Sequence, residues 1–223
     1  MCVAQTGKKL AAYFPHSWQR AIRRSLYRRQ VKNDWFVSNE PEFALMHQYL
    51  QPGDWAIDVG ANIGVYTKRF SDLVGPTGRV IAFEPIPETF ALLTSNMELL
   101  RVQNVTLLNA AASNDTRIVG MDVPSFDTGL PNYYCAAVSP EAKGFRVMTL
   151  SIDGLSLPRV KVLKIDAEGH DKEVLLGAMN LIARDFPVLL IESIPPDIER
   201  RLMHLNYRSV AYPNSPNKVL MVY

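Results

Sequence analysis

Three groups of acidic and small residues each follow an apolar run. The first, DVGANIG, extends from Asp58 to Gly64. The second is a single acid, Glu84, after VIAF, and the third, KIDAEGH, contains Asp166 and His170. Carboxylates accept hydrogen bonds from hydroxyl and ammonium groups, and glycines let a ligand approach the backbone. These groups therefore predict a binding site for a ligand that carries hydroxyl or ammonium groups.

The first group has the spacing D-x-G-x-x-x-G and precedes a segment with helical periodicity. Gly60 allows a sharp turn, and Gly64 allows the following helix to lie close to a sheet. The dinucleotide pattern G-x-G-x-x-G is absent, because Asn62 and Ile63 interrupt the glycine spacing. Asp58 is also a poor neighbour for a pyrophosphate, so this group disfavours a dehydrogenase.

The second acid, Glu84, stands 26 residues after Asp58 at the end of the next apolar run. A carboxylate at this place can accept two hydrogen bonds from a ribose diol. An adenosine with a cationic amino-acid tail satisfies both acids, and S-adenosylmethionine is such a molecule. We therefore expect this cofactor.

The elements that must position these residues alternate along the chain. We expect buried strands at 55–59, 80–84, 105–111, 160–166 and 187–193, and helices at 66–74, 88–100, 172–186 and 195–206. Such alternation predicts an open α/β sheet, mostly parallel, with helices on both faces. The acids all follow strand ends, where ligands bind in such sheets.

Three further regions depart from this alternation. Short alternating segments over 112–150 predict hairpins inserted at the sheet edge or over the site. Segments 207–212 and 218–223 predict a closing antiparallel hairpin around PNSPN. Segments 16–31 and 39–50 have helical spacing. We therefore divide the chain into an N-terminal helical arm, 1–38, and one main domain, 39–223.

The charge supports this division. The chain of 223 residues has a net charge of +2, but its first 33 residues hold eight basic side chains and no acid, which leaves −6 for the rest. The basic arm could lie on an anionic membrane, bind nucleic acid, or dock on the acidic body, and we favour the last. No apolar run reaches the roughly 20 residues of a membrane helix, and two cysteines form no metal or disulfide pattern. We expect a cytoplasmic location, with peripheral membrane contact through the arm as an alternative.

Five linked motifs resemble one known family. The segments PGDWAIDVGANIGVYT, VIAFEPIPETFALLTSNMELL, NVTLLNAAASN, MTLSIDGL and VKVLKIDAEGHDKEVLLGA have the order and approximate spacing of the FkbM family of S-adenosylmethionine-dependent methyltransferases. The resemblance extends from about Glu40 to the C-terminal NKVLMVY. It implies a class I methyltransferase, Rossmann-like, fold and O-methylation of a hydroxyl on a sugar-containing or natural-product small molecule.

The resemblance also assigns roles to residues. The cofactor-binding positions that it implies are Asp58, Gly60, Ala61, Asn62, Gly64, Glu84, Ala110, Ala111 and Asp166. Ser113 falls in the segment beside the adenine, and Glu168 and Gly169 belong to the K-I-D-x-E-G signature. Asp171 departs from the family, which usually has Glu there, and MTLSIDGL departs from T-L-D-x-L. These departures leave the role of Asp171 open.

The third group is where we expect catalysis. Methyl transfer to an aliphatic hydroxyl is helped by a base or by a metal that lowers the hydroxyl pKa. We expect Asp166 to face the reacting atoms and His170, four residues later at a helix start, to accept the proton. A divalent metal held by Asp166, Glu192 and Glu168 is a less favoured alternative.

Two other functions remain open at this stage. An RNA methyltransferase could use the basic arm, although the acidic body makes a nucleic-acid partner the weaker expectation. A non-catalytic protein could bind S-adenosylmethionine alone, although it would have no need of Asp166 and His170. The sequence indicates neither the identity of the acceptor nor the oligomeric state.

Overall fold

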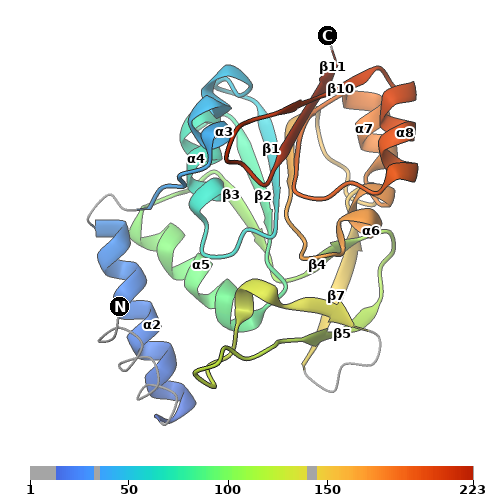
Figure 1. Ribbon diagram of the computed structural model, residues 1–223. Helices are drawn as coiled ribbons and strands as arrows, with labels where there is room; N and C mark the ends of the chain where they lie inside the picture. Colours follow the sequence, from blue (N-terminus) through green and yellow to red (C-terminus); the bar gives the residue numbers. More distant parts are fainter. Residues whose placement is uncertain (1–13, 33–35, 140–144, 223) are drawn as a thin grey trace.

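A seven-stranded sheet forms the centre of the computed structural model, which describes residues 14–32, 36–139 and 145–222 (Figure 1). Its strands are β1 (Trp55–Val59), β2 (Arg79–Phe83), β3 (Val105–Leu108), β8 (Val160–Ile165), β9 (Val188–Ile191), β10 (Tyr207–Ala211) and β11 (Lys218–Val222). They lie in the order β10-β11-β9-β8-β1-β2-β3. The five strands from β3 to β9 are parallel, and β11 pairs antiparallel with both β9 and β10.

Helices cover both faces because apolar side chains point alternately to the two faces of each strand. One face packs against α3 (Pro41–Leu45), η1 (Met46–Gln48), α4 (Val65–Val74) and α5 (Pro87–Leu99). The other packs against α6 (Asp171–Leu176), α7 (Met179–Asp185) and α8 (Pro196–His204). The predicted open α/β sheet, mostly parallel with a C-terminal antiparallel hairpin, is therefore confirmed.

A second, four-stranded sheet lies beside the first, beyond the carboxyl ends of its central strands (Figure 1). It contains β4 (Ala111–Ser113), β5 (Ile118–Asp122), β6 (Ala137–Ser139) and β7 (Arg146–Ser151), in the order β4-β7-β5-β6. A short 3-10 helix, η2 (Tyr133–Cys135), precedes β6. The hairpins predicted over 112–150 are thus a small sheet that begins at Ala111.

Two elements predicted next to the second sheet were wrong in extent. The expected strand 105–111 stops at Leu108, and the chain then turns into β4 of the second sheet. The expected helix 172–186 is interrupted between α6 and α7 at Gly177, where an added Cβ would lie 1.9 Å from the carbonyl oxygen of Ser113. In both places the second sheet, packed against the first, overrides the local apolar pattern.

The N-terminal arm contains α2 (His16–Lys32), which packs along α5 (Figure 1). The predicted helix 16–31 is therefore confirmed, whereas the predicted helix 39–50 is shorter and consists of α3 and η1. The division of the chain at residue 38 stays a prediction. Within the described residues, no helix is long and apolar enough to cross a membrane.

Candidate active site

The loop after β1 is held against the ends of its two neighbouring strands. The backbone N–H groups of Gly60 and Ala61 donate to the carbonyl oxygen of Phe83, at 3.1 and 2.9 Å. Gly60 has a φ of +72°, and a Cβ there would lie 1.9 Å from the carbonyl oxygen of Asp166. Only glycine therefore lets the loop pass so close to the end of β8.

Gly64, the second glycine of DVGANIG, permits close packing of two helices. Gly64 stands at the N-cap of α4, and a Cβ there would lie 2.6 Å from Met97 and 2.7 Å from Leu93, both on α5. The missing side chain thus lets α4 and α5 lie close together, and α4 begins directly behind the loop. Gly64 lines neither of the two cavities described below.

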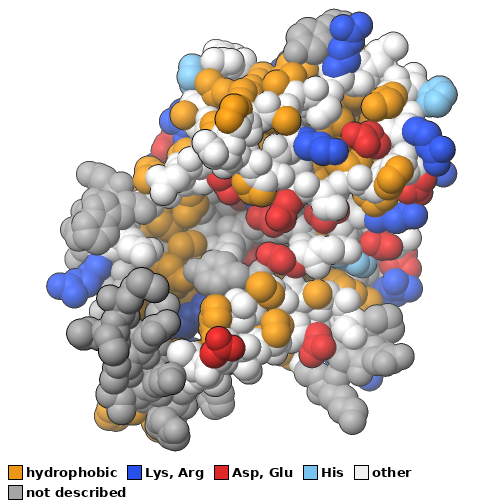
Figure 2. All heavy atoms as spheres, viewed as in Figure 1, with side chains coloured by type: hydrophobic (Ala, Val, Ile, Leu, Met, Phe, Trp, Pro, Cys, Tyr) orange, Lys and Arg blue, Asp and Glu red, His pale blue; other side chains and the backbone are white. Residues whose placement is uncertain are grey.

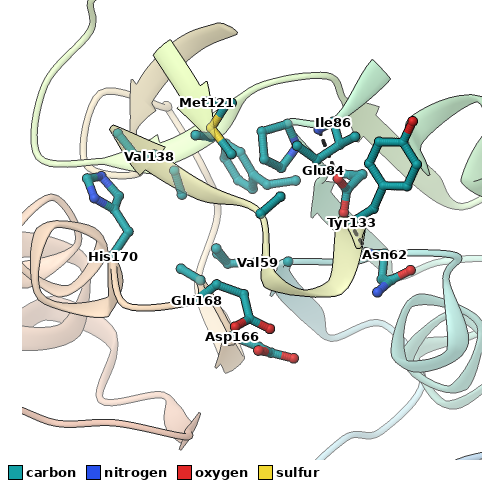
Figure 3. Close-up of a pocket in the computed structure, with 17 residues that line it drawn as sticks. Val59, Asn62, Glu84, Ile86, Met121, Tyr133, Val138, Asp166, Glu168 and His170 are labelled. Carbon is teal, nitrogen blue, oxygen red and sulfur yellow. Dashed lines mark hydrogen bonds between the residues drawn. The ribbon is translucent and has the colours of Figure 1, made fainter. Parts of the chain in front are cut away.

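Glu84 follows β2 and turns its carboxylate toward this loop. The carboxylate accepts hydrogen bonds from the backbone N–H groups of Asn62 and Ile86, both at 2.9 Å (Figure 3). Burial raises the pKa of Glu84 to about 7, and the two N–H donors oppose that rise. The two N–H donors thus fix the orientation of the carboxylate, while burial disfavours its ionised form. Hydrogen bonds from the hydroxyl groups of a ligand would stabilise that ionised form.

Asp58 lies on β1 and is fully buried. Its Oδ2 accepts a hydrogen bond of 2.6 Å from Thr67, while its Oδ1 has no hydrogen-bond partner among the described residues. Burial raises the pKa of Asp58, and the nearby Lys164 opposes this rise. The unsatisfied oxygen suits a ligand that brings a hydrogen-bond donor or a positive charge.

Lys164, on β8, is the cation of this part of the site. Its Nζ lies 3.7 Å from Asp58 Oδ1 and 3.1 Å from Asp166 Oδ2. Burial lowers the pKa of Lys164, but Asp166 and Asp58 outweigh this effect and the net pKa is raised. We did not predict this lysine as a site residue. The sequence held part of the signal, because Lys164 and Asp166 are two apart on the predicted strand and share a face, but the pairing of β1 with β8 that brings in Asp58 is seen only in the structure.

Two adjoining cavities open at the carboxyl ends of the strands. One is lined by Glu84, Ile86, Ala111, Tyr133 and His170 among others, and the second by Glu40, Asp58, Ala61, Tyr66 and Lys164 among others. Gly60, Asn62 and Asp166 line both. A ligand with two chemically different ends can therefore extend from one cavity into the other past Asp166.

The alanines after β3 divide between core and cavity. Ala111 and Ala112 line the first cavity, whereas Ala110 is buried in the core on the α6 face of the sheet and lines neither cavity. The predicted role of Ala110 in cofactor binding stays a prediction, and Ala112, which we did not predict, lines the first cavity beside Ala111.

The segment after β8 is a strained turn. Glu168 has a φ of +47°, which is uncommon for a residue other than glycine, and Gly169 follows with +85°. The carboxylate of Asp171 accepts a hydrogen bond of 3.1 Å from the backbone N–H of Ala167, which closes the turn before α6. Strained residues of this kind concentrate at functional sites. The turn directs Asp166 and Glu168 to the cavity (Figure 3).

His170 lines the first cavity but points away from Asp166 and Glu168 (Figure 3). Its Nε2 lies 3.0 Å from the Ser113 hydroxyl, and its Nδ1 lies 3.6 Å from Glu173. Burial lowers the pKa of His170, and Glu173 opposes the decrease. Both ring nitrogens thus have partners in the protein, so the predicted role as proton acceptor stays a prediction that competes with Glu168.

Acidic side chains surround the hollow at the centre of the face shown in Figure 2. Burial raises the pKa of Glu168, and the carboxylates of Asp166, Glu192 and Asp171 raise it further. Burial and Asp166 likewise raise the pKa of Glu192. Among the described residues no group of three or more His, Cys, Asp or Glu side chains could hold a metal ion. Carboxylates at such a rim can accept hydrogen bonds from hydroxyl groups.

These features fit S-adenosylmethionine. Glu84 offers a fixed acceptor for a ribose diol, and the unsatisfied Oδ1 of Asp58 offers an acceptor near a cationic tail. Gly60, which lines both cavities, lets the loop after β1 pass against Asp166 at the junction between them.

Comparison with known proteins supports the same family. The model of the methyltransferase FkbM domain matches residues 58–209. Hexuronic acid methyltransferase AglP of Haloferax volcanii is 30% identical over 142 residues, which cover 62% of this chain and 55% of AglP. The 31-O-demethyl-FK506 methyltransferase FkbM of Streptomyces tacrolimicus is 49% identical over 53 residues, 24% of this chain and 20% of that protein. The matched segments thus span about half of AglP and a fifth of the Streptomyces protein.

Solved structures agree in fold. The methyltransferase FkbM from Methylobacillus flagellatus superposes with a TM-score of 0.56 at 16% identity, covering 78% of this chain and 49% of that one. A protein described as a putative rRNA methylase from Clostridium thermocellum gives 0.51 at 12% identity, covering 82% and 94%. These two likenesses confirm the class I methyltransferase fold, and the domain match shows that the chain belongs to the FkbM family of methyltransferases.

Proposed function

We propose that this chain is an S-adenosylmethionine-dependent O-methyltransferase that acts on a hydroxyl of a sugar-containing or natural-product small molecule. The observation that carries the proposal is the junction of the two cavities at Asp166, between Glu84 on one side and Asp58 on the other. Glu84 would hold the ribose, and Asp58 with the loop of Gly60 to Asn62 would hold the amino-acid tail. The reacting centre then falls beside Asp166.

When bound, S-adenosylmethionine supplies a methyl group activated by its sulfonium. What remains for the protein is to align the acceptor oxygen and to take up its proton. Asp166, half exposed at the junction, is placed to orient the acceptor hydroxyl. Lys164 holds one oxygen of Asp166 at 3.1 Å, which fixes the side chain for that task.

Two side chains compete for the proton. His170 has the right chemistry, but its nitrogens face Ser113 and Glu173. Glu168 lies beside Asp166 at the cavity, and its raised pKa makes it a stronger base than an ordinary glutamate (Figure 3). We therefore propose Glu168 as the proton acceptor and assign His170 to the cavity wall.

The relatives support an acceptor rich in hydroxyl groups. One is described as a hexuronic acid methyltransferase and the other as a 31-O-demethyl-FK506 methyltransferase. The acidic rim of Glu168 and Glu192 can accept hydrogen bonds from several hydroxyls. The same rim would repel the many phosphates of RNA more strongly than the single carboxylate of a hexuronic acid, which disfavours RNA as the acceptor. The likeness to the rRNA methylase concerns the fold alone.

Two measurements test the proposal. Calorimetric titration should give a Kd for S-adenosylmethionine of about 10 µM or tighter, roughly −7 kcal/mol. Incubation with methyl-labelled cofactor and a panel of sugars, uronic acids and polyketides should transfer label to a hydroxyl. Binding of NAD without S-adenosylmethionine would overturn the cofactor assignment, and binding without transfer to any acceptor would favour the non-catalytic alternative.

A further inference from the structure

Helix α2 packs on the body through its polar side. The Arg24 side chain donates a hydrogen bond of 3.1 Å to the Ser95 hydroxyl on α5. The Arg23 guanidinium lies 4.6 Å from the ring centroid of Tyr133, which lines the first cavity. Val31 is buried near the end of the helix. Helix α2 thus docks on the body, as we favoured from the sequence, and Arg23 and Arg24 contribute to this contact.

The apolar side of α2 faces outward. Trp18, Ile22 and Leu26 follow one another at intervals of four residues and are 62%, 38% and 54% exposed. Phe14, just before the helix, is exposed as well, and its ring centroid lies 6.0 Å from that of Trp18. Single exposed apolar residues are common, but four in one row form a surface that favours a partner. We call this row the apolar stripe.

Basic side chains flank the apolar stripe. Arg28 and Arg29 are exposed on the helix, as is Arg20, and residues 14–32 include no acid. A row of large apolar side chains bordered by arginines is the pattern of helices that lie in the interface of an anionic membrane, with the apolar side inserted. A second copy of α2 would bring like charges together, and nucleic acid would leave the apolar stripe in water.

We propose that the apolar stripe of α2, with Arg28 and Arg29, binds the surface of an anionic lipid bilayer. The apolar side chains enter the region between headgroups and acyl chains, and the arginines contact anionic headgroups. Because Trp18 is amphipathic, it suits this interfacial depth. The proposal does not depend on the methyl-transfer assignment, since it concerns a separate surface.

Sedimentation with vesicles tests the proposal on the full chain. Vesicles of phosphatidylcholine with 30% phosphatidylglycerol should bind the protein at 50 mM salt, and pure phosphatidylcholine should bind it far less. The variant Trp18→Ser/Ile22→Ser/Leu26→Ser should weaken binding at least about 30-fold. A matched variant, Ile118→Ser/Met148→Ser/Met203→Ser, removes similarly exposed apolar residues elsewhere and should bind as the unchanged chain does.

The charges are tested separately. Arg28→Gln/Arg29→Gln should weaken binding to the anionic vesicles by about 30-fold. The control Arg200→Gln/Arg201→Gln removes two exposed arginines from α8 and should have little effect. S-adenosylmethionine affinity and the thermal unfolding midpoint, measured on every variant, show that each one is folded.

Three outcomes would overturn the proposal. The unchanged chain could fail to bind anionic vesicles, or the variant without the apolar stripe could bind as tightly as the unchanged chain. Thirdly, sedimentation velocity could show that the unchanged chain is a dimer and that the variant without the apolar stripe is a monomer. That last result would assign the stripe to a second copy of the chain.

Discussion

The cofactor side and the acceptor side of the cavity differ in how their carboxylates are held. On the cofactor side, Glu84 and Asp58 are almost wholly buried, and backbone N–H groups or Thr67 fix their oxygens. On the acceptor side, Glu168 and Glu192 are exposed at the rim. Neighbouring carboxylates repel the charge of each and raise its pKa. The first side is organised before any ligand arrives, whereas the second can adapt to its ligand.

This difference explains why the sequence predicts the cofactor but not the acceptor. A buried carboxylate needs particular partners at particular positions, and these leave a motif. An exposed residue such as Glu192, in the loop after β9, can change at little cost to stability. The predictions that follow probe this contrast.

The largest effect is expected at Gly60. Gly60→Ala would place a Cβ 1.9 Å from a backbone oxygen of Asp166, at a φ of +72°. We expect a loss of at least about 3 kcal/mol in unfolding free energy and no measurable cofactor binding. Gly169→Ala is the control, because its φ is +85° but nothing lies within 4 Å of the new Cβ. It should cost only about 1 kcal/mol. Urea titration and calorimetry distinguish the two, and equal costs would refute the close-approach argument.

The next largest effect is expected at Glu84, which we propose binds the ribose of the cofactor. Glu84→Ala removes the proposed diol acceptor and leaves the backbone N–H groups of Asn62 and Ile86 without their partner. We expect cofactor affinity to fall at least about 100-fold, since hydrogen bonds to a charged group contribute about 1.5–3 kcal/mol each. Glu98→Ala, at an exposed position on α5, should leave affinity unchanged. A tightly binding Glu84→Ala protein would remove this residue from the site.

The acceptor side should respond in rate and not in cofactor affinity. Asp166→Asn and Glu168→Gln should each lower kcat by about 100-fold, the lower range for a positioned base. His170→Ala should lower it by about tenfold or less if the histidine only supports the wall. Steady-state kinetics, with an acceptor identified by the labelled-cofactor screen, provides the measurement. A larger loss for His170→Ala than for Glu168→Gln would restore the histidine as proton acceptor.

A smaller effect is expected from pH. Because the pKa of Glu84 is raised to about 7 in the folded protein, protonation favours folding. This contribution is fully present below the ordinary pKa of the carboxyl and is lost as the pH rises through 7; it amounts to about 3 kcal/mol. Hydroxyl donors of the cofactor favour the ionised form, so cofactor affinity should rise up to about tenfold per pH unit below 7. Calorimetry from pH 5.5 to 8 measures this, and a flat affinity profile would contradict the assignment.

The smallest effect is expected from metal removal. Since the described residues contain no group of three or more His, Cys, Asp or Glu side chains placed to hold a metal ion, treatment with EDTA should leave kcat unchanged within about twofold. Re-addition of Mg²⁺ is the control. A loss of activity that Mg²⁺ restores would bring back the alternative in which Asp166 and Glu192 bind a metal.

Much of the architecture was predictable because the buried strands are short apolar runs separated by helices. The strands at Trp55–Val59 and Val160–Ile165 and the closing hairpin were predicted within a few residues. The strand after Asn104 and the helix after His170 were predicted too long. In both cases the second sheet packs close to the chain, at Ala111 and at Gly177, and no local pattern records that contact.

The sequence by itself determined which acids stand at the ends of strands, the resemblance to the family, and the alternation of strands and helices. These follow from local patterns, because side-chain alternation and glycine spacing act within a few residues. Only the tertiary structure decided that Lys164 joins Asp58 to Asp166, that His170 turns to Ser113, and that α2 presents its apolar stripe to the outside. Each of these depends on contacts between segments far apart in the chain, and packing alone sets which partner a side chain meets.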